Sequence, residues 1–168
     1  VRWFEYGCFC PVMRLHGYRW PLQPQYGTTG GATCVSGAPN EVWSYTDQVC
    51  EILSDYLRLR ERMLPYITEL MEEAHEKGTP VMRPLFYDFP EDKESWNVET
   101  EYMFGPKVLV KPITDADARE TDVYLPGGAS WTNAWTGETF EGGQKVHVAA
   151  PIEQIPLFTR DGYKLPMK

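Results

Sequence analysis

Arg14 and His16 are the residues whose types and spacing could do chemistry, since they lie two apart at the end of the apolar run PVM. A guanidinium can form an ion pair, and an imidazole N–H can donate a directional hydrogen bond. The residues alone leave simpler roles open: His16 could be satisfied inside a core, and Arg14 could form an ion pair that holds a strand end. We expect residues 11–16 to form a buried strand with both side chains at its polar end.

The four cysteines offer a second possible chemistry. Cys8 and Cys10 have the spacing C-x-C, while Cys34 and Cys50 stand alone, so no second pair follows at the spacing of a zinc ribbon. We therefore expect reduced, half-buried thiols in a cytoplasmic protein, with no metal site and no disulfide framework. The sequence contains no Ser-His-Asp order, P-loop, HExxH or EF-hand pattern.

Composition excludes several classes of function. The chain has 168 residues, of which 42% are hydrophobic, and its formal net charge is -8. This is too apolar for a disordered chain, and too acidic for a protein that neutralises nucleic-acid phosphates. No apolar run is long enough to span a bilayer. Because the sequence begins inside an apolar helical pattern, without a cap or a signal peptide, we expect a fragment of a longer protein.

The elements that must position these side chains include a long helical pattern. Apolar residues follow helical spacing from about residue 47 to residue 77, with Asp47 as the predicted N-cap and Gly78 as the C-cap. Pro65 lies inside this pattern and must kink or divide the helix. Residues 1–10 are expected to form a shorter helix.

Two polar or irregular stretches are harder to interpret. The segment 17–46 is rich in Gly, Pro, Ser and Thr, and it carries Trp20, Trp43 and Tyr45. These aromatic rings could line a binding site, but we favour packing of the loop onto the rest of the fold. A charged flank on the long helix is expected to be solvated or salt-bridged; it consists of Arg58, Arg60, Glu61 and Arg62.

The second half of the chain changes period. Three prolines predict an extended, buried segment over residues 79–92, in which Arg83 and Asp88 make structural polar contacts. Short strand-like runs follow from about residue 105, and Gly127-Gly128 and Gly142-Gly143 are predicted to be hairpin turns. The fold class is therefore α+β, with a helix-rich part at residues 1–104 and an antiparallel β part at residues 105–168.

Five stretches in series resemble glycoside hydrolase family 31, the α-glucosidases, α-xylosidases and their relatives. They are RWFEYGCFCPVMRLHG, LRLRERMLPYITELMEEAHEKGTPVMRPLFYDFP, EYMFGPKVLVKPI, VYLPGGASWTNAWTGETFEGGQ and APIEQIPLFTRDG. The resemblance implies a (β/α)8 barrel followed by β-sandwich domains. Residues 1–104 would be the last segments of the barrel, and residues 105–168 would be the proximal all-β domain.

The resemblance also implies a function. Such a protein would hydrolyse α-linked glucosides or xylosides with retention, through a covalent glycosyl-enzyme, without a metal or an organic cofactor. The family's nucleophile and acid/base aspartates lie on earlier barrel strands, so this chain would hold no catalytic residue and would be inactive alone. By the same resemblance, His16 donates a hydrogen bond to hydroxyls of the substrate sugar. Arg14 either supports that substrate site or only forms an ion pair.

A different class of function remains open on the sequence alone. The β part could be a non-catalytic module that binds a glycan or a partner protein, if aromatic side chains lie exposed along one sheet face. Trp131, Trp135 and Phe140 decide this, because burial between sheets would make them core residues. A separated barrel segment would also expose apolar surface, so we expect possible self-association. No partner among nucleic acids or membranes is expected.

Overall fold

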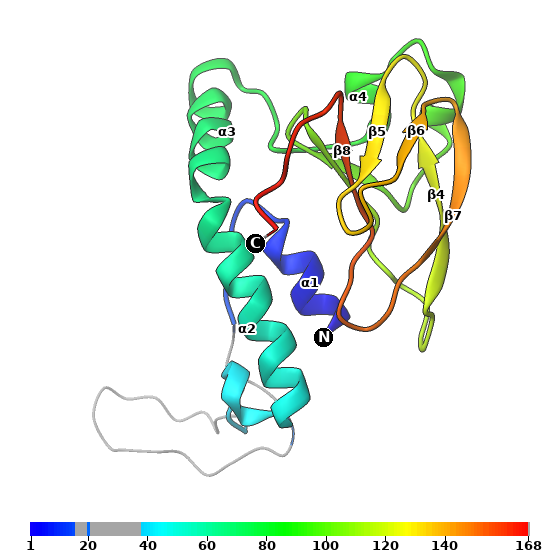
Figure 1. Cartoon of the computed structure of the whole chain (residues 1–168). Coiled ribbons are helices and arrows are strands. Elements are labelled where there is room, and N and C mark those ends of the chain that lie inside the picture. The colour runs from blue at the N-terminus through cyan, green and yellow to red at the C-terminus, as the bar shows by residue number, and fades with distance from the viewer. Residues whose placement is uncertain (16–19, 21–37, 168) are drawn as a thin grey trace.

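The computed structural model describes residues 1–15, 20 and 38–167. In chain order, the elements are α1 (Arg2–Cys8), η1 (Val42–Ser44), α2 (Asp47–Arg62), α3 (Leu64–Lys77), β1 (Met82–Arg83), α4 (Leu85–Asp88), η2 (Lys93–Trp96), β2 (Tyr102–Phe104), β3 (Val108–Val110), β4 (Glu120–Leu125), β5 (Ser130–Asn133), β6 (Thr139–Glu141), β7 (Gln144–Ala149) and β8 (Leu157–Arg160). Figure 1 shows α2 and α3 along one side, the strands on the other, and α1 between them.

The long helical pattern forms two helices, as Pro65 predicted. Pro65 lies in the first turn of α3, where its missing N–H would have no intrahelical partner in any case. Gly78 ends α3 in the left-handed conformation, with φ of 70°. The predicted N-cap is wrong by one residue: Thr46 caps α2 and its hydroxyl accepts from the N–H of Val49 at 3.3 Å, because Asp47 already has helical geometry.

The strands form two antiparallel sheets. One sheet has six strands in the order β1-β2-β3-β8-β5-β6, and the other pairs β4 with β7. The antiparallel β region is therefore confirmed, but the two glycine pairs are not hairpin turns. Gly127-Gly128 joins β4 to β5, and Gly142-Gly143 joins β6 to β7, so each turn carries the chain from one sheet to the other.

The central strands β3 and β8 of the six-stranded sheet are buried on both faces by residues that alternate along them. Val108 and Val110 of β3 pack into the core shared with the helices, whereas Leu109 between them packs into the core shared with β4 and β7. On β8, Leu157 and Phe158 divide in the same way. The period of two residues in a strand thus produces three layers: helices, the large sheet and the small sheet (Figure 1).

The proline-rich segment is less extended than predicted. Its middle forms the single helical turn α4, which Pro84 precedes at the N-cap with φ of -60° and ψ of 152°. The prediction failed because proline is also compatible with the start of a helix. The predicted buried polar contacts are confirmed: the Arg83 guanidinium lies 3.1 Å from the Asp88 carboxylate and 3.7 Å from that of Glu73.

Gly105 permits a close approach between α3 and the sheet. It lies in the turn between β2 and β3 with φ of 59°, and a Cβ there would lie 2.4 Å from the Tyr66 hydroxyl and 2.5 Å from a Leu70 methyl. The six-stranded sheet includes β1 and β2, which precede this residue. The predicted domain boundary between residues 104 and 105 stays a prediction.

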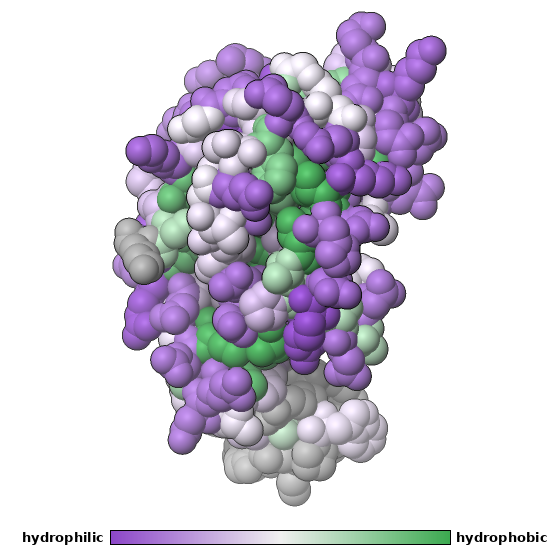
Figure 2. All heavy atoms as spheres, turned by 45° about the vertical axis from the view of Figure 1, so that its right-hand side comes forward, coloured by the Kyte–Doolittle hydropathy of each residue, from purple (hydrophilic) through white to green (hydrophobic). Residues whose placement is uncertain are grey.

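The surface is largely hydrophilic on the face shown in Figure 2, where hydrophobic side chains appear in limited areas between the polar ones. This distribution agrees with the fraction of charged residues in the sequence, 24%. None of the helices in the described residues combines the length and the apolarity needed to cross a bilayer.

Candidate functional site

Arg60 fixes the chain where it leaves α1. Its Nη1 donates to the carbonyl oxygens of Cys8 at 2.7 Å and Cys10 at 2.8 Å, and its Nη2 donates to that of Pro11 at 3.0 Å. The last carbonyls of a helix lack intrahelical partners, and a cation near them also interacts favourably with the helix dipole. The prediction of a solvated or salt-bridged side chain is therefore wrong for Arg60, whereas Arg58 of the same flank does form an exposed pair with Asp55. We call residues 8–11 the 8–11 turn.

A second side chain completes this turn. The Tyr102 hydroxyl of β2 donates to the carbonyl of Phe9 at 2.9 Å. Burial raises the pKa of Tyr102, so the hydroxyl stays a neutral donor. Four consecutive carbonyls are therefore satisfied by two side chains, one from α2 and one from β2. The 8–11 turn is fixed to both the helical layer and the sheet.

The 8–11 turn leads directly to the residues singled out in the sequence. Arg14 is exposed, and Val12, two residues earlier, is 76% exposed. The predicted buried strand is wrong over residues 11–15, because no described strand lies beside them and the carbonyl of Pro11 pairs with Arg60 instead. His16 lies outside the described residues. The sugar-binding roles of Arg14 and His16 stay predictions.

The cysteines near this turn are held as thiols. Cys8, Cys10 and Cys50 are free, whereas Cys34 lies outside the described residues. Burial raises the pKa of Cys8 to about 12 and also raises the pKa of Cys10. A protonated, buried thiol is a poor nucleophile and a poor metal ligand. Among the residues that the structure describes, no group of three His, Cys, Asp or Glu side chains could hold a metal ion.

The aromatic residues before α2 do not pack as predicted. Trp20 is 77% exposed and Trp43 of η1 is 73% exposed. The favoured packing role is therefore wrong for these two rings within the described structure. In η1, Val42 is the residue that turns into the core beside α2, which leaves the adjacent Trp43 on the outer side. Tyr45 is half-exposed, and its hydroxyl pairs with the Asn40 side chain.

Of the three aromatic residues that decide the alternative, Trp131 is a core residue, whereas Trp135 and Phe140 are partly buried against the two cores. Trp131 is fully buried, and its indole N–H donates to the carbonyl of Pro126 at 2.9 Å. Phe140 packs against the core between the two sheets, and Trp135 packs against the core shared with the helices. These three rings therefore do not form an exposed stripe, which weakens the alternative of a module that binds a glycan along a sheet face.

The buried acids of the described residues serve the fold. Glu101 accepts from the backbone N–H of Tyr124 at 3.0 Å and lies 3.5 Å from the Lys111 ammonium, and burial raises its pKa to about 7. Glu5 is also fully buried and pairs with the Arg2 guanidinium at 3.1 Å. Both carboxylates are enclosed among side chains. Positioning of the 8–11 turn, which precedes Arg14, comes instead from Arg60 and Tyr102.

The fold and the site together define the class of protein, namely the end of an α/β barrel joined to a β-sandwich that supports it. The family model described as "Glycosyl hydrolases family 31 TIM-barrel domain" matches residues 1–70, and "Glycosyl hydrolase family 31 C-terminal domain" matches residues 78–165. The chain belongs to glycoside hydrolase family 31. The sequence resemblance and the predicted fold class are both confirmed.

Relatives with known names agree with this assignment. An α-xylosidase of Saccharolobus solfataricus is 36% identical over 99% of this chain, and α-glucosidase 2 of Bacillus thermoamyloliquefaciens is 35% identical over 96% of it. A crystal structure of a family 31 α-xylosidase from a soil metagenome, complexed with xylose, superposes with a TM-score of 0.91 at 46% identity over 98% of this chain. The chain spans 20% of the first relative, 18% of the second and 25% of the crystallised protein.

Proposed function

We propose that these residues form part of a retaining α-glycosidase, with α-xylosides as preferred substrates and α-glucosides as the alternative. The likeness to the xylose-bound α-xylosidase carries this proposal, since it combines a TM-score of 0.91 with 46% identity. Two other proteins of solved structure differ in sequence identity to this chain. An α-xylosidase from Xanthomonas citri is 36% identical in sequence, whereas a dextranase from Flavobacterium johnsoniae is 29% identical. Among these solved structures the α-xylosidases rank above the dextranase, and this supports xylosides as the preferred substrates.

In this proposal, the chain contributes binding and support. Active sites of such barrels are built at the C-terminal ends of the strands. Arg14 follows the 8–11 turn, which Arg60 and Tyr102 hold in place, and His16 follows two residues later in the sequence. The imidazole N–H of His16 donates to a sugar hydroxyl, and Arg14 supports the same site. Such a bond accelerates cleavage to the extent that it strengthens as the ring approaches an oxocarbenium ion.

The experiment is an assay of the full-length protein with 4-nitrophenyl α-xyloside, α-glucoside and the corresponding β-anomers. We expect turnover of the α-anomers only, with a larger kcat/KM for the xyloside, and NMR of the first product should show the α-anomer. Inversion, or preference for a β-anomer, would contradict the proposal. The 168-residue chain alone should release no nitrophenol, because in this proposal the nucleophile lies on earlier barrel strands outside these residues.

Two further proposals concern the isolated chain and its compartment. We propose that the isolated chain self-associates, because Trp3 and Trp43 are 83% and 73% exposed. Sedimentation should show dimers or larger species that Trp3→Ser weakens, and a strict monomer would contradict this.

We also propose a cytoplasmic location, which the free thiols of Cys8 and Cys10 support. Cell fractionation of the full-length protein tests it.

A further inference from the structure

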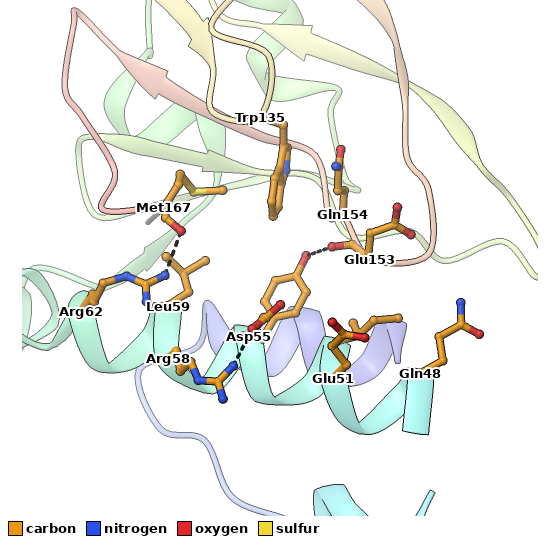
Figure 3. Close-up of a pocket in the computed structure, with 12 residues that line it drawn as sticks. Gln48, Glu51, Asp55, Arg58, Leu59, Arg62, Trp135, Glu153, Gln154 and Met167 are labelled. Atoms are coloured by element: carbon orange, nitrogen blue, oxygen red, sulfur yellow. Dashed lines mark hydrogen bonds and ion pairs between the residues drawn. The ribbon is translucent and has the colours of Figure 1, made fainter. Parts of the chain in front are cut away.

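A cavity of about 620 Å³ lies between α2 and the β region, as the close-up in Figure 3 shows. Its floor is one face of α2, where side chains recur three or four residues apart, at Gln48, Glu51 and Asp55. Trp135 and the 153–154 segment form the opposite wall. The volume falls within the range of roughly 300–1,000 Å³ that is usual for small-molecule sites.

The walls of this cavity are held by hydrogen bonds to fixed partners. The Trp135 indole N–H donates to the carbonyl of Ile155 at 2.7 Å, which fixes the ring and leaves it half-buried. The Tyr56 hydroxyl donates to the carbonyl of Glu153 at 3.1 Å and accepts from the N–H of Ile155 at 2.9 Å. The indole therefore presents a preformed apolar surface to the cavity.

The polar groups of the cavity include unused acceptors. Asp55 pairs with Arg58 at 2.8 Å, and the Arg62 guanidinium donates to two backbone carbonyls near residue 167. The carboxylates of Glu51 and Glu153 have no hydrogen-bond or ion-pair partner among the described residues, and both are exposed. With both arginines engaged, the unpaired carboxylates give this cavity an excess of negative charge, which disfavours phosphates and other anions.

We propose that this cavity binds a neutral sugar ring. A pyranose has an apolar C–H face, which suits the indole of Trp135, and a rim of hydroxyls that both donate and accept. Carboxylates of Glu51 and Glu153 accept from such hydroxyls, and the side-chain amides of Gln48 and Gln154 can donate to them. The proposal stands on this geometry and goes beyond the proposed hydrolysis, because it requires no reaction.

The test follows the Trp135 indole N–H signal of the ¹⁵N-labelled chain by NMR, assigned by its loss in Trp135→Phe. Methyl α-glucopyranoside should shift this signal with a Kd of about 1–10 mM, typical of a small ligand held by few contacts. Glucose 6-phosphate should bind at least tenfold more weakly. An unmoved signal up to 50 mM glucoside (about five times the upper expected Kd), or equal binding of the phosphate, would overturn the proposal.

Two matched variants locate the sugar. Glu51→Arg should weaken binding at least fivefold, whereas Glu61→Arg should not change it, because Glu61 is exposed on the same helix but does not line the cavity. Equal binding by both variants would overturn the inference. Arg14→Ala should leave binding intact. Loss in Arg14→Ala with retention in Glu51→Arg would place the sugar at residue 14, which refutes this proposal while supporting the proposed function.

Discussion

Replacing Arg60 with alanine tests how the chain positions the segment that carries Arg14. The substitution leaves the carbonyls of Cys8, Cys10 and Pro11 without their donor, at positions that are only partly accessible to water. Hydrogen bonds to charged groups contribute about 1.5–3 kcal/mol each, and water replaces part of this, so we expect a loss of about 2–4 kcal/mol in the free energy of unfolding.

Arg58→Ala is the matched control, because Arg58 lies on the same helix and pairs with Asp55 while both side chains stay exposed. An exposed pair of this kind contributes about 0–1 kcal/mol. Urea unfolding should separate the two variants, and hydrogen exchange should accelerate at residues 9–15 in Arg60→Ala only. Arg60→Lys should be intermediate, since an ammonium lacks the planar fork. If the free energies of unfolding of Arg60→Ala and Arg58→Ala differ by less than about 0.5 kcal/mol, the three hydrogen bonds of Arg60 have no measurable effect on stability. That result would refute the reasoning.

Three other predictions concern the β region. Gly105→Ala should destabilise the chain by about 2 kcal/mol or more beyond Gly128→Ala, measured by urea unfolding, since both residues have positive φ but only the first alanine would meet side chains within 3 Å; equal losses would contradict this. Burial raises the pKa of Glu101 from 4.5 to about 7, so the stability of wild type relative to Glu101→Gln should be highest below pH 4.5 and fall by up to about 3 kcal/mol as pH rises through 7; a difference that is independent of pH would count against it. Hydrogen bonding to Asp122 raises the pKa of His147, so the stability from this pair is present below pH 6.5 and lost as pH rises through the raised pKa. NMR titration should show that Asp122→Asn lowers the pKa of His147, and an unchanged value would rule out this cause.

Local patterns predicted the helices and the positions of the strands well. Helical spacing, Pro65 and Gly78 specify where α2 and α3 begin and end, because capping and the missing proline N–H act within a few residues. The strand runs after residue 105 were predictable for the same reason. Strand order was not predictable, since β8 pairs with β3 and β5 through contacts between residues far apart in the sequence.

The side chains that hold the 8–11 turn in place could not be predicted from the sequence. Arg60 lies among charged residues on a helix flank, and nothing in its own spacing shows that the end of α1 packs against it. The signal that could have found it is the end of α1 itself, whose carbonyls need donors from elsewhere in the chain. Tyr102 supplies the second donor from β2, across 93 residues of sequence. Segment resemblance indicated the family, while only packing revealed how the 8–11 turn is held.

The most direct test of the central claim, that the segment after the 8–11 turn binds the sugar being cleaved, is kcat/KM of the full-length enzyme carrying His16→Ala. Removing one preorganised hydrogen-bond donor to a transition state costs about 100-fold or more, so we predict a loss of that size on the α-xyloside. His75→Ala is the control, since His75 lies in the last turn of α3, and it should change kcat/KM less than about twofold. Similar small effects of both substitutions would contradict the account.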